Sequence, residues 1–170
     1  MEAKLEPIVK ALQTQFGGAF EEFRGELHYF VQPAQIVEAL TLLRDRHQFE
    51  LLSAQTAVDY WPQTAPRFHV IYQLSSLAQN VTLQLRVPVD GDNPTVPTAS
   101  GVYDSANWRE REMLDMFGIR FEGHPDPRRI LNPDDSEGHP LRKDFPLGYE
   151  EPQFSFNYED IDLRKPYAKE

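Results

Sequence analysis

The chain is 170 residues long, contains 27 Asp and Glu residues against 17 Lys and Arg residues, and has no cysteine. This length allows one domain of ordinary size with an appendage, because a single core usually occupies about 100–200 residues. Without a thiol the chain cannot ligate an iron–sulfur cluster or form a disulfide, so a metal site would need His, Asp or Glu. The net charge of -10 argues against nucleic acid as a partner, since phosphate contacts depend on Lys and Arg.

The sequence shows no sign of direct contact with a membrane. No apolar run approaches the roughly 20 residues that a membrane-spanning helix requires, and the first residues lack the layout of a signal peptide. A basic amphipathic helix that would bind lipid is also missing. We therefore expect a cytosol-like compartment and a membrane association that is only indirect.

The first part of the chain predicts two helices and a hairpin. Apolar residues recur at helical spacing over residues 3–16, and a second helix begins at Pro33, a residue that suits the first helical turn. Between the helices, two short aromatic runs at 19–23 and 27–31 predict the paired strands of a hairpin.

Three further strands follow the second helix. Apolar and polar residues alternate along 68–74 and 81–87, and less clearly along 49–58. We expect Pro88 to end the last strand. The order helix–strand–strand–helix–three strands is typical of an α+β domain with two layers, in which the helices pack on one face of the sheet.

A short helix is predicted over residues 108–117. Asn107 and Glu110 have the spacing of a capping box, and Gly118 suits the left-handed residue that commonly ends a helix. We place the end of the α+β domain at Gly118, so that the domain spans residues 1–118.

Residues 119–170 differ in composition from the domain. Seven of the 14 prolines lie in the last fifty residues, which prevents a continuous helix and interrupts backbone pairing. The segment nevertheless keeps aromatic and aliphatic residues that a disordered tail would usually lack. We therefore predict an extended, proline-rich C-terminal arm that lies along the surface of another protein.

Charged residues are densest between Glu110 and Asp144. Arg111 and Asp115 are four residues apart and share one face of the predicted helix. Carboxylates on this face could serve acid–base chemistry, but a solvated or salt-bridged helix face is the interpretation that we favour.

The motif Glu-Gly-His-Pro occurs twice in this region, at 122–125 and at 137–140. A free-standing metal-dependent enzyme would combine the two histidines with nearby carboxylates: His124, His139, Glu112 and Asp115. The spacing matches no standard metal site, so we favour histidines that hydrogen-bond to backbone or partner groups. No nucleophile elbow, P-loop or dinucleotide-binding motif occurs, and we predict no self-contained active site.

The same region resembles the signature of a known family. Its sequence reads Glu-Arg-Glu-Met-Leu-Asp-Met-Phe-Gly-Ile over 110–119, Phe-Glu-Gly-His-Pro over 121–125, Arg-Arg-Ile-Leu over 128–131 and Glu-Gly-His-Pro-Leu-Arg-Lys-Asp-Phe-Pro-Leu over 137–147. This closely resembles the thirty-kilodalton subunit family of respiratory complex I. The family includes the C subunit of bacterial NADH-quinone oxidoreductase and the J subunit of its plastid and cyanobacterial counterpart. The expected α+β domain is similar to the family's fold.

The resemblance implies a cofactor-free subunit in the peripheral arm of a proton-translocating NADH-quinone oxidoreductase. Such a subunit packs against the forty-nine-kilodalton type of subunit that helps to form the quinone site, here called the quinone-site subunit, and lies near iron–sulfur subunits. FMN, iron–sulfur clusters and quinone would then be bound by other subunits. The complex would place this chain peripherally at the cytoplasmic side of the cell (inner) membrane. The alternative is an equivalent subunit of a ferredoxin-linked or hydrogenase-type membrane complex.

We expect the charged helix and the two Glu-Gly-His-Pro segments to contact partners, supporting assembly and electron transfer from NADH to quinone. Basic residues there would pair with carboxylates or carbonyl groups of the partner. The residues expected to bind a partner are Glu110, Arg111, Glu112, Asp115, His124, Arg128, Arg129, His139, Arg142, Lys143, Asp144 and Phe145. No catalytic, cofactor-binding or metal-binding residue is expected.

Overall fold

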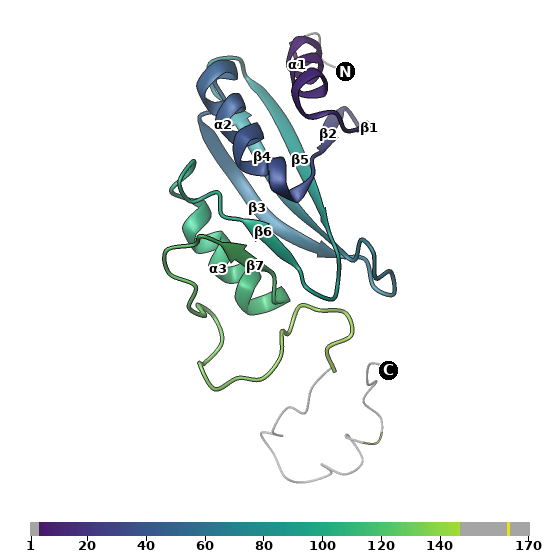
Figure 1. Ribbon diagram of the computed structural model, residues 1–170, viewed down its shortest axis with the longest axis vertical. Helices are drawn as coiled ribbons and strands as arrows, with labels where there is room; N and C mark the ends of the chain where they lie inside the picture. Colours follow the sequence, from purple (N-terminus) through teal and green to yellow (C-terminus); the bar gives the residue numbers. More distant parts are fainter. Residues whose placement is uncertain (1–3, 147–162, 164–170) are drawn as a thin grey trace.

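The computed structural model describes residues 4–146 and Leu163 (Figure 1). The helices and strands predicted for the domain are confirmed in type and order. They are α1 (Glu6–Phe16), β1 (Phe20–Phe23), β2 (Glu26–Phe30), the short 3-10 helix η1 (Pro33–Gln35), α2 (Ile36–His47), β3 (Leu51–Asp59), β4 (Phe68–Ser76) and β5 (Val81–Val89). Three further elements follow: β6 (Thr95–Pro97), α3 (Ala106–Phe117) and β7 (Arg120–Glu122).

One mixed sheet and a layer of helices form the body of the molecule (Figure 1). The sheet has the strand order β1-β2-β5-β4-β3, in which β2 and β5 run parallel and all other neighbours are antiparallel. Helices α1 and α2 lie on one face of the sheet, and α3 packs beside β3. The predicted two-layer α+β class is therefore confirmed.

The hydrophobic core lies between this sheet face and the helices. On β4, Phe68, Val70, Tyr72 and Leu74 are buried, whereas the residues between them are partly exposed, and β5 repeats the alternation. Leu40 and the other buried residues of α2 recur at helical spacing and cover these side chains. Each fully buried Leu, Val or Phe contributes about 1.5–3 kcal/mol, so this alternation is what holds the helices to the sheet.

Strand β5 continues to Val89, although we expected Pro88 to end it. On the side of β5 that faces β2, the carbonyl of Arg86 accepts a hydrogen bond from the N–H of Val31. Backbone groups two residues apart point to the same side of a strand, so the missing N–H of Pro88 faces the side where β2 has already ended. The proline therefore removes no hydrogen bond from the sheet, and the strand tolerates it.

Helix α3 begins at Ala106, earlier than predicted, and its N-cap Ser105 makes no side-chain capping bond. The predicted capping box between Asn107 and Glu110 is wrong, because the Glu110 side chain points into the interior. The predicted end is confirmed: Gly118 has a φ of 72° and adopts the left-handed conformation.

The packed structure extends beyond Gly118, the residue at which we expected the domain to end. Strand β7 pairs in parallel with β6, and the sequence pattern predicted neither strand. Ile119 and Phe121 are 0% and 8% exposed and belong to the hydrophobic core. The chain then returns to α3 and to the sheet before Pro146. From residue 147 on, the predicted arm lies outside the described residues, apart from Leu163.

None of the helices in the described part of the chain is long and apolar enough to span a membrane.

Candidate partner-binding site

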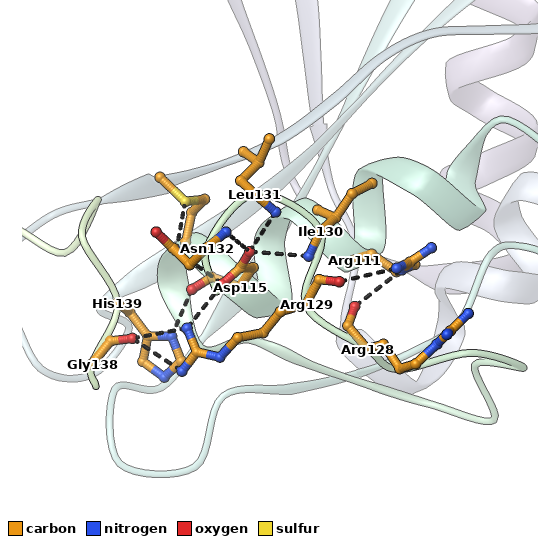
Figure 2. A network of polar contacts seen from close by, with 10 residues as sticks. Arg111, Asp115, Arg128, Arg129, Ile130, Leu131, Asn132, Gly138 and His139 are labelled. Carbon is orange, nitrogen blue, oxygen red and sulfur yellow. Dashed lines mark hydrogen bonds and ion pairs between the residues drawn. The ribbon is translucent and has the colours of Figure 1, made fainter. Parts of the chain in front are cut away.

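Asp115 on α3 binds a short loop of the arm, residues 128–132, which we call the arm loop (Figure 2). Its Oδ2 accepts hydrogen bonds of 3.1, 2.8 and 2.9 Å from three successive backbone N–H groups, those of Ile130, Leu131 and Asn132. Its Oδ1 accepts hydrogen bonds of 2.9 Å from Arg129 Nη1 and Asn132 Nδ2. Because Asp115 is 0% exposed, these five bonds replace its hydration.

The same contacts determine the charge of Asp115. Burial alone would raise the pKa of Asp115, but hydrogen bonds from Asn132, Leu131 and Ile130 outweigh burial and hold the pKa well below its usual range. The carboxyl group is therefore ionised at neutral pH. An ionised carboxylate with both oxygens occupied is a structural anchor and a poor general acid or base.

Arg111, one helical turn before Asp115, binds the carbonyl groups of the arm loop. Its Nε and Nη2 donate hydrogen bonds of 3.0 Å to the carbonyl oxygens of Arg128 and Arg129. Its guanidinium also lies over the ring of Trp108, 5.3 Å from the ring centroid. The two residues predicted to share one face of the helix thus bind the same loop. Asp115 accepts hydrogen bonds from the N–H groups of the loop, and Arg111 donates to the carbonyl groups of the loop.

The two Glu-Gly-His-Pro segments attach to different ends of α3. His124 Nε2 lies 3.1 Å from the carbonyl oxygen of Asn107 at the start of the helix, and His139 Nδ1 lies 2.9 Å from that of Asp115 near its end. In His124 the other ring nitrogen accepts a hydrogen bond of 3.0 Å from the N–H of Asp126. The proton of each ring is therefore assigned to the nitrogen that faces the helix. In both copies of the motif, the histidine thus attaches the arm to a backbone carbonyl group of α3.

This arrangement does not favour the metal-site hypothesis. His124 and His139 bind carbonyl groups at different ends of α3, Glu112 is exposed, and Asp115 is occupied by the arm loop. Among the residues that the structure describes, no group of three His, Asp or Glu side chains is placed to hold a metal ion. The two histidines and Asp115 therefore form hydrogen bonds within the chain.

Glu110 lies in the interior beside β3 and β6. Its Oε1 accepts a hydrogen bond of 2.7 Å from the N–H of Ala99, and its Oε2 accepts one from the hydroxyl of Thr98. Gln55 Nε2 lies 3.4 Å from Oε1, and His124 Nε2 lies 3.9 Å from Oε2. Burial raises the pKa of Glu110, and the hydrogen bonds from Thr98 and Ala99 oppose it only in part. Glu110 thus attaches the segment after β6 to α3.

A second ionic cluster, which we did not predict, attaches the arm to the sheet. Arg67, the residue before β4, binds Asp59 at the end of β3 through two hydrogen bonds of 3.0 and 2.9 Å, and it also binds Asp144 of the arm. The N–H of Lys143 donates a further bond of 2.9 Å to Asp59. Burial alone would raise the pKa of Asp59, but the bonds from Arg67 and Lys143 hold it below its usual range. Opposite charges at the ends of two consecutive apolar strands were the signal in the sequence.

The end of α3 accepts the arm closely. Arg142 Nε donates a hydrogen bond of 2.6 Å to the carbonyl oxygen of the last residue of the helix. A Cβ atom on Gly118 would lie 2.5 Å from His139 Nε2 and 2.6 Å from Arg142 Nη2, so only glycine permits this approach. Phe145 lies against Gly138 in the same way, because a Cβ there would be 2.6 Å from its ring.

Most of the side chains predicted to bind a partner make contacts within the chain. Those that are buried or half-buried are Glu110, Arg111, Asp115, His124, Arg129, His139, Arg142, Asp144 and Phe145. Those that are exposed are Glu112, Arg128 and Lys143. Large apolar side chains that we did not predict as contact residues are exposed on α3 and the arm: Trp108, Ile130, Leu131 and Leu141. The signal for the last three was their place in a segment that forms no core of its own.

Comparison with known proteins identifies relatives over nearly the whole length. The family model described as respiratory-chain NADH dehydrogenase, 30 Kd subunit, matches residues 29–151. The C subunit of NADH-quinone oxidoreductase from Roseiflexus sp. (strain RS-1) is 49% identical, over 98% of this chain and 95% of the relative. The protein of the same name from Roseiflexus castenholzii is 48% identical, over 88% of this chain and 86% of the relative.

Solved structures show a similar fold. The trypsin-resistant fragment of Nqo5 has 32% sequence identity and a TM-score of 0.65, over 72% of this chain and 98% of that chain. A chain of the membrane-bound sulfane sulfur reductase, an archaeal respiratory membrane complex, has 24% identity and a TM-score of 0.72, over 98% of this chain and 96% of that chain. The second likeness concerns the fold alone. With a family model that matches most of its length and relatives at close to half identity, this chain belongs to the family of 30 Kd subunits of the respiratory-chain NADH dehydrogenase.

Proposed function

We propose that this chain is a peripheral-arm subunit of a proton-translocating NADH-quinone oxidoreductase, in which it packs against the quinone-site subunit. The observation that carries the proposal is the 49% identity to the C subunit of NADH-quinone oxidoreductase from Roseiflexus sp. (strain RS-1), over 98% of this chain and 95% of the relative. The alternative is the equivalent subunit of a ferredoxin-linked or hydrogenase-type complex.

The geometry around α3 supports a role in docking. Asp115, Arg111 and the two motif histidines use their polar atoms to hold the arm, and no catalytic arrangement is formed by them. A structure held in this way presents a fixed surface to a neighbour, which lowers the entropy cost of binding. We infer that the chain supports assembly and thereby electron transfer from NADH to quinone.

The remaining parts of the proposal concern the complex as a whole. FMN, iron–sulfur clusters and quinone would be bound by other subunits, consistent with a chain that has no cysteine to ligate a cluster. The subunit would be attached peripherally at the cytoplasmic side of the membrane through its partners. Neighbouring iron–sulfur subunits are the further partners that we propose.

The test is to isolate the full chain from its native host with an affinity tag, after gentle solubilisation of membranes. We expect the quinone-site subunit and iron–sulfur subunits in stoichiometric amounts, with NADH-dependent quinone reduction in the purified complex. Recovery with ferredoxin-linked or hydrogenase-type subunits would establish the alternative. Recovery of the chain alone under conditions that keep the complex intact would refute both.

The contribution of the arm needs a truncation that spares the packed structure. Ending the chain after Gly118 would remove the buried Ile119 and Phe121, so a loss of assembly could reflect unfolding. Ending it after Pro146 keeps every contact to α3 and β4 described above. We expect that shortened chain to fold and to be incorporated poorly, and normal incorporation would show that residues 147–170 are dispensable.

A further inference from the structure

The arm loop is held so firmly by α3 that its conformation is defined before any partner binds. Asp115 accepts the N–H groups of three of its residues, and Arg111 donates to the carbonyls of two. The backbone polar groups that face the helix are therefore satisfied internally. What the loop can offer to a partner is its side chains.

The side chains at the centre of the arm loop are apolar and partly exposed. In Figure 2, Ile130 and Leu131 extend from the loop on the side opposite to Asp115. Ile130 is 37% exposed and Leu131 is 62% exposed. Exposed aliphatic side chains on a loop with so many internal hydrogen bonds are a fixed apolar projection, which is the form of a binding hot spot.

A further apolar side chain lies close to this projection. The N–H of Leu141 donates a hydrogen bond of 3.0 Å to the carbonyl of Met116, and Asn132 of the arm loop contacts the Met116 sulfur at 3.4 Å. Leu141 is 47% exposed, which makes it a further exposed apolar side chain on the arm beside the end of α3.

The exposed charged side chains that directly follow the arm loop are acidic. Arg129 pairs with Asp115, and Arg128 is bound by Asp126 through two hydrogen bonds of 2.6 and 2.8 Å. The residues that follow the loop add three exposed carboxylates without an intervening cation: Asp134, Asp135 and Glu137. A partner surface that complements this rim carries Lys or Arg.

From these observations we propose that Ile130 and Leu131 form an apolar anchor that inserts into an apolar, basic-rimmed groove on the quinone-site subunit. This inference rests on the proposed function and adds Ile130 and Leu131 to the contact residues expected from the sequence, which were charged residues, two histidines and Phe145. Asp115 acts as a positioning residue, because it holds the anchor without touching the partner.

The experiment is a binding titration of the full-length chain with the purified quinone-site subunit from the same organism. Leu131→Ser and Ile130→Ser should each weaken binding at least about tenfold, as truncation of a central hot-spot residue does. Leu77→Ser is the matched control, since Leu77 is 71% exposed in the turn between β4 and β5. It should change the affinity less than twofold. All three positions are exposed, and unchanged urea midpoints will verify that the variants fold.

The outcomes separate this inference from the proposed function. If the unsubstituted chain does not bind the quinone-site subunit, the proposed function fails. If it binds and the two serine variants at the arm loop bind equally well, the apolar anchor is refuted and the proposed function stands. Asp134→Lys combined with Asp135→Lys should weaken binding and reduce its dependence on salt. Equal or tighter binding of that double variant would refute the basic rim.

Discussion

Replacing Asp115 by Asn tests how the arm is attached, because it preserves the shape of the side chain and removes its charge. The carboxylate accepts two hydrogen bonds at Oδ1 and three at Oδ2. Asparagine retains one acceptor oxygen and replaces the other with an NH2 donor. In its better orientation the amide oxygen takes the place of Oδ2, and the NH2 group then faces Arg129 Nη1 and Asn132 Nδ2, which are both donors.

The magnitude follows from the bonds that are lost. Hydrogen bonds to a charged group contribute about 1.5–3 kcal/mol each, so the loss of the two bonds at Oδ1 costs roughly 3–5 kcal/mol once partial relaxation is allowed. The three remaining bonds also weaken, since their acceptor is no longer ionised. If the arm loop detaches from α3 while the rest of the chain stays folded, this free energy corresponds to an increase of about a hundredfold or more in the fraction of molecules with a detached loop.

Two measurements on the full-length chain detect either response. Urea unfolding can be followed through the fluorescence of the two tryptophans, Trp61 beside Arg67 and Trp108 on α3 beside Arg111. Trypsin cleavage after Arg128 and Arg129, identified by mass spectrometry, reports local opening of the arm loop. We expect Asp115→Asn to lower the free energy of unfolding by the amount above, or to accelerate this cleavage at least about tenfold, since proteolysis follows the open population.

Glu112→Gln is the matched control, because Glu112 is an exposed carboxylate on the same helix. Its effect on the free energy of unfolding should stay within about 0.5 kcal/mol, as for most surface substitutions. If Asp115→Asn were as mild as Glu112→Gln in both measurements, the conclusion that Asp115 anchors the arm would be refuted.

Three further substitutions test the other buried contacts. Burial raises the pKa of Glu110, so the contribution of this residue to stability is present below its unfolded pKa and is lost as the pH rises through its folded pKa. In urea unfolding, the free energy of unfolding of the unsubstituted chain should therefore fall relative to that of Glu110→Gln by up to about 1.4 kcal/mol per pH unit above about pH 4.5. If the two free energies differed by the same amount at every pH, the raised pKa of Glu110 would be contradicted. Gly118→Ala should cost about 1–3 kcal/mol in the same assay, because of its φ of 72° and the close approach of the arm, whereas Gly101→Ala, which has open space for a Cβ, should not. Arg67→Met leaves the buried carboxylate of Asp59 without its cation, which should reduce the free energy of unfolding by about 3–5 kcal/mol and lower the thermal midpoint accordingly. An unchanged thermal midpoint would show that other groups compensate the charge of Asp59.

The predictions that rested on hydrophobic periodicity agree with the structure. The alternation of Phe68, Val70, Tyr72 and Leu74 predicted β4, and Gly118 marked the end of α3. Where a local rule was wrong, a distant segment explains the difference. Glu110 had the spacing of a capping residue, but the chain after β6 offers it the N–H of Ala99, and it turns inward.

The sequence by itself therefore determined the order of all elements except β6, β7 and η1, the α+β class and the family, because periodicity and a contiguous motif depend only on neighbouring residues. Only the tertiary structure decided what the charged residues do. Arg111 and Asp115 have the spacing of a surface salt bridge. Whether the face of α3 that carries them is exposed to solvent or buried depends on whether a distant segment of the chain packs on it. The arm loop returns, so the charges lie beneath it in internal hydrogen bonds, and Ile130 and Leu131 lie outside.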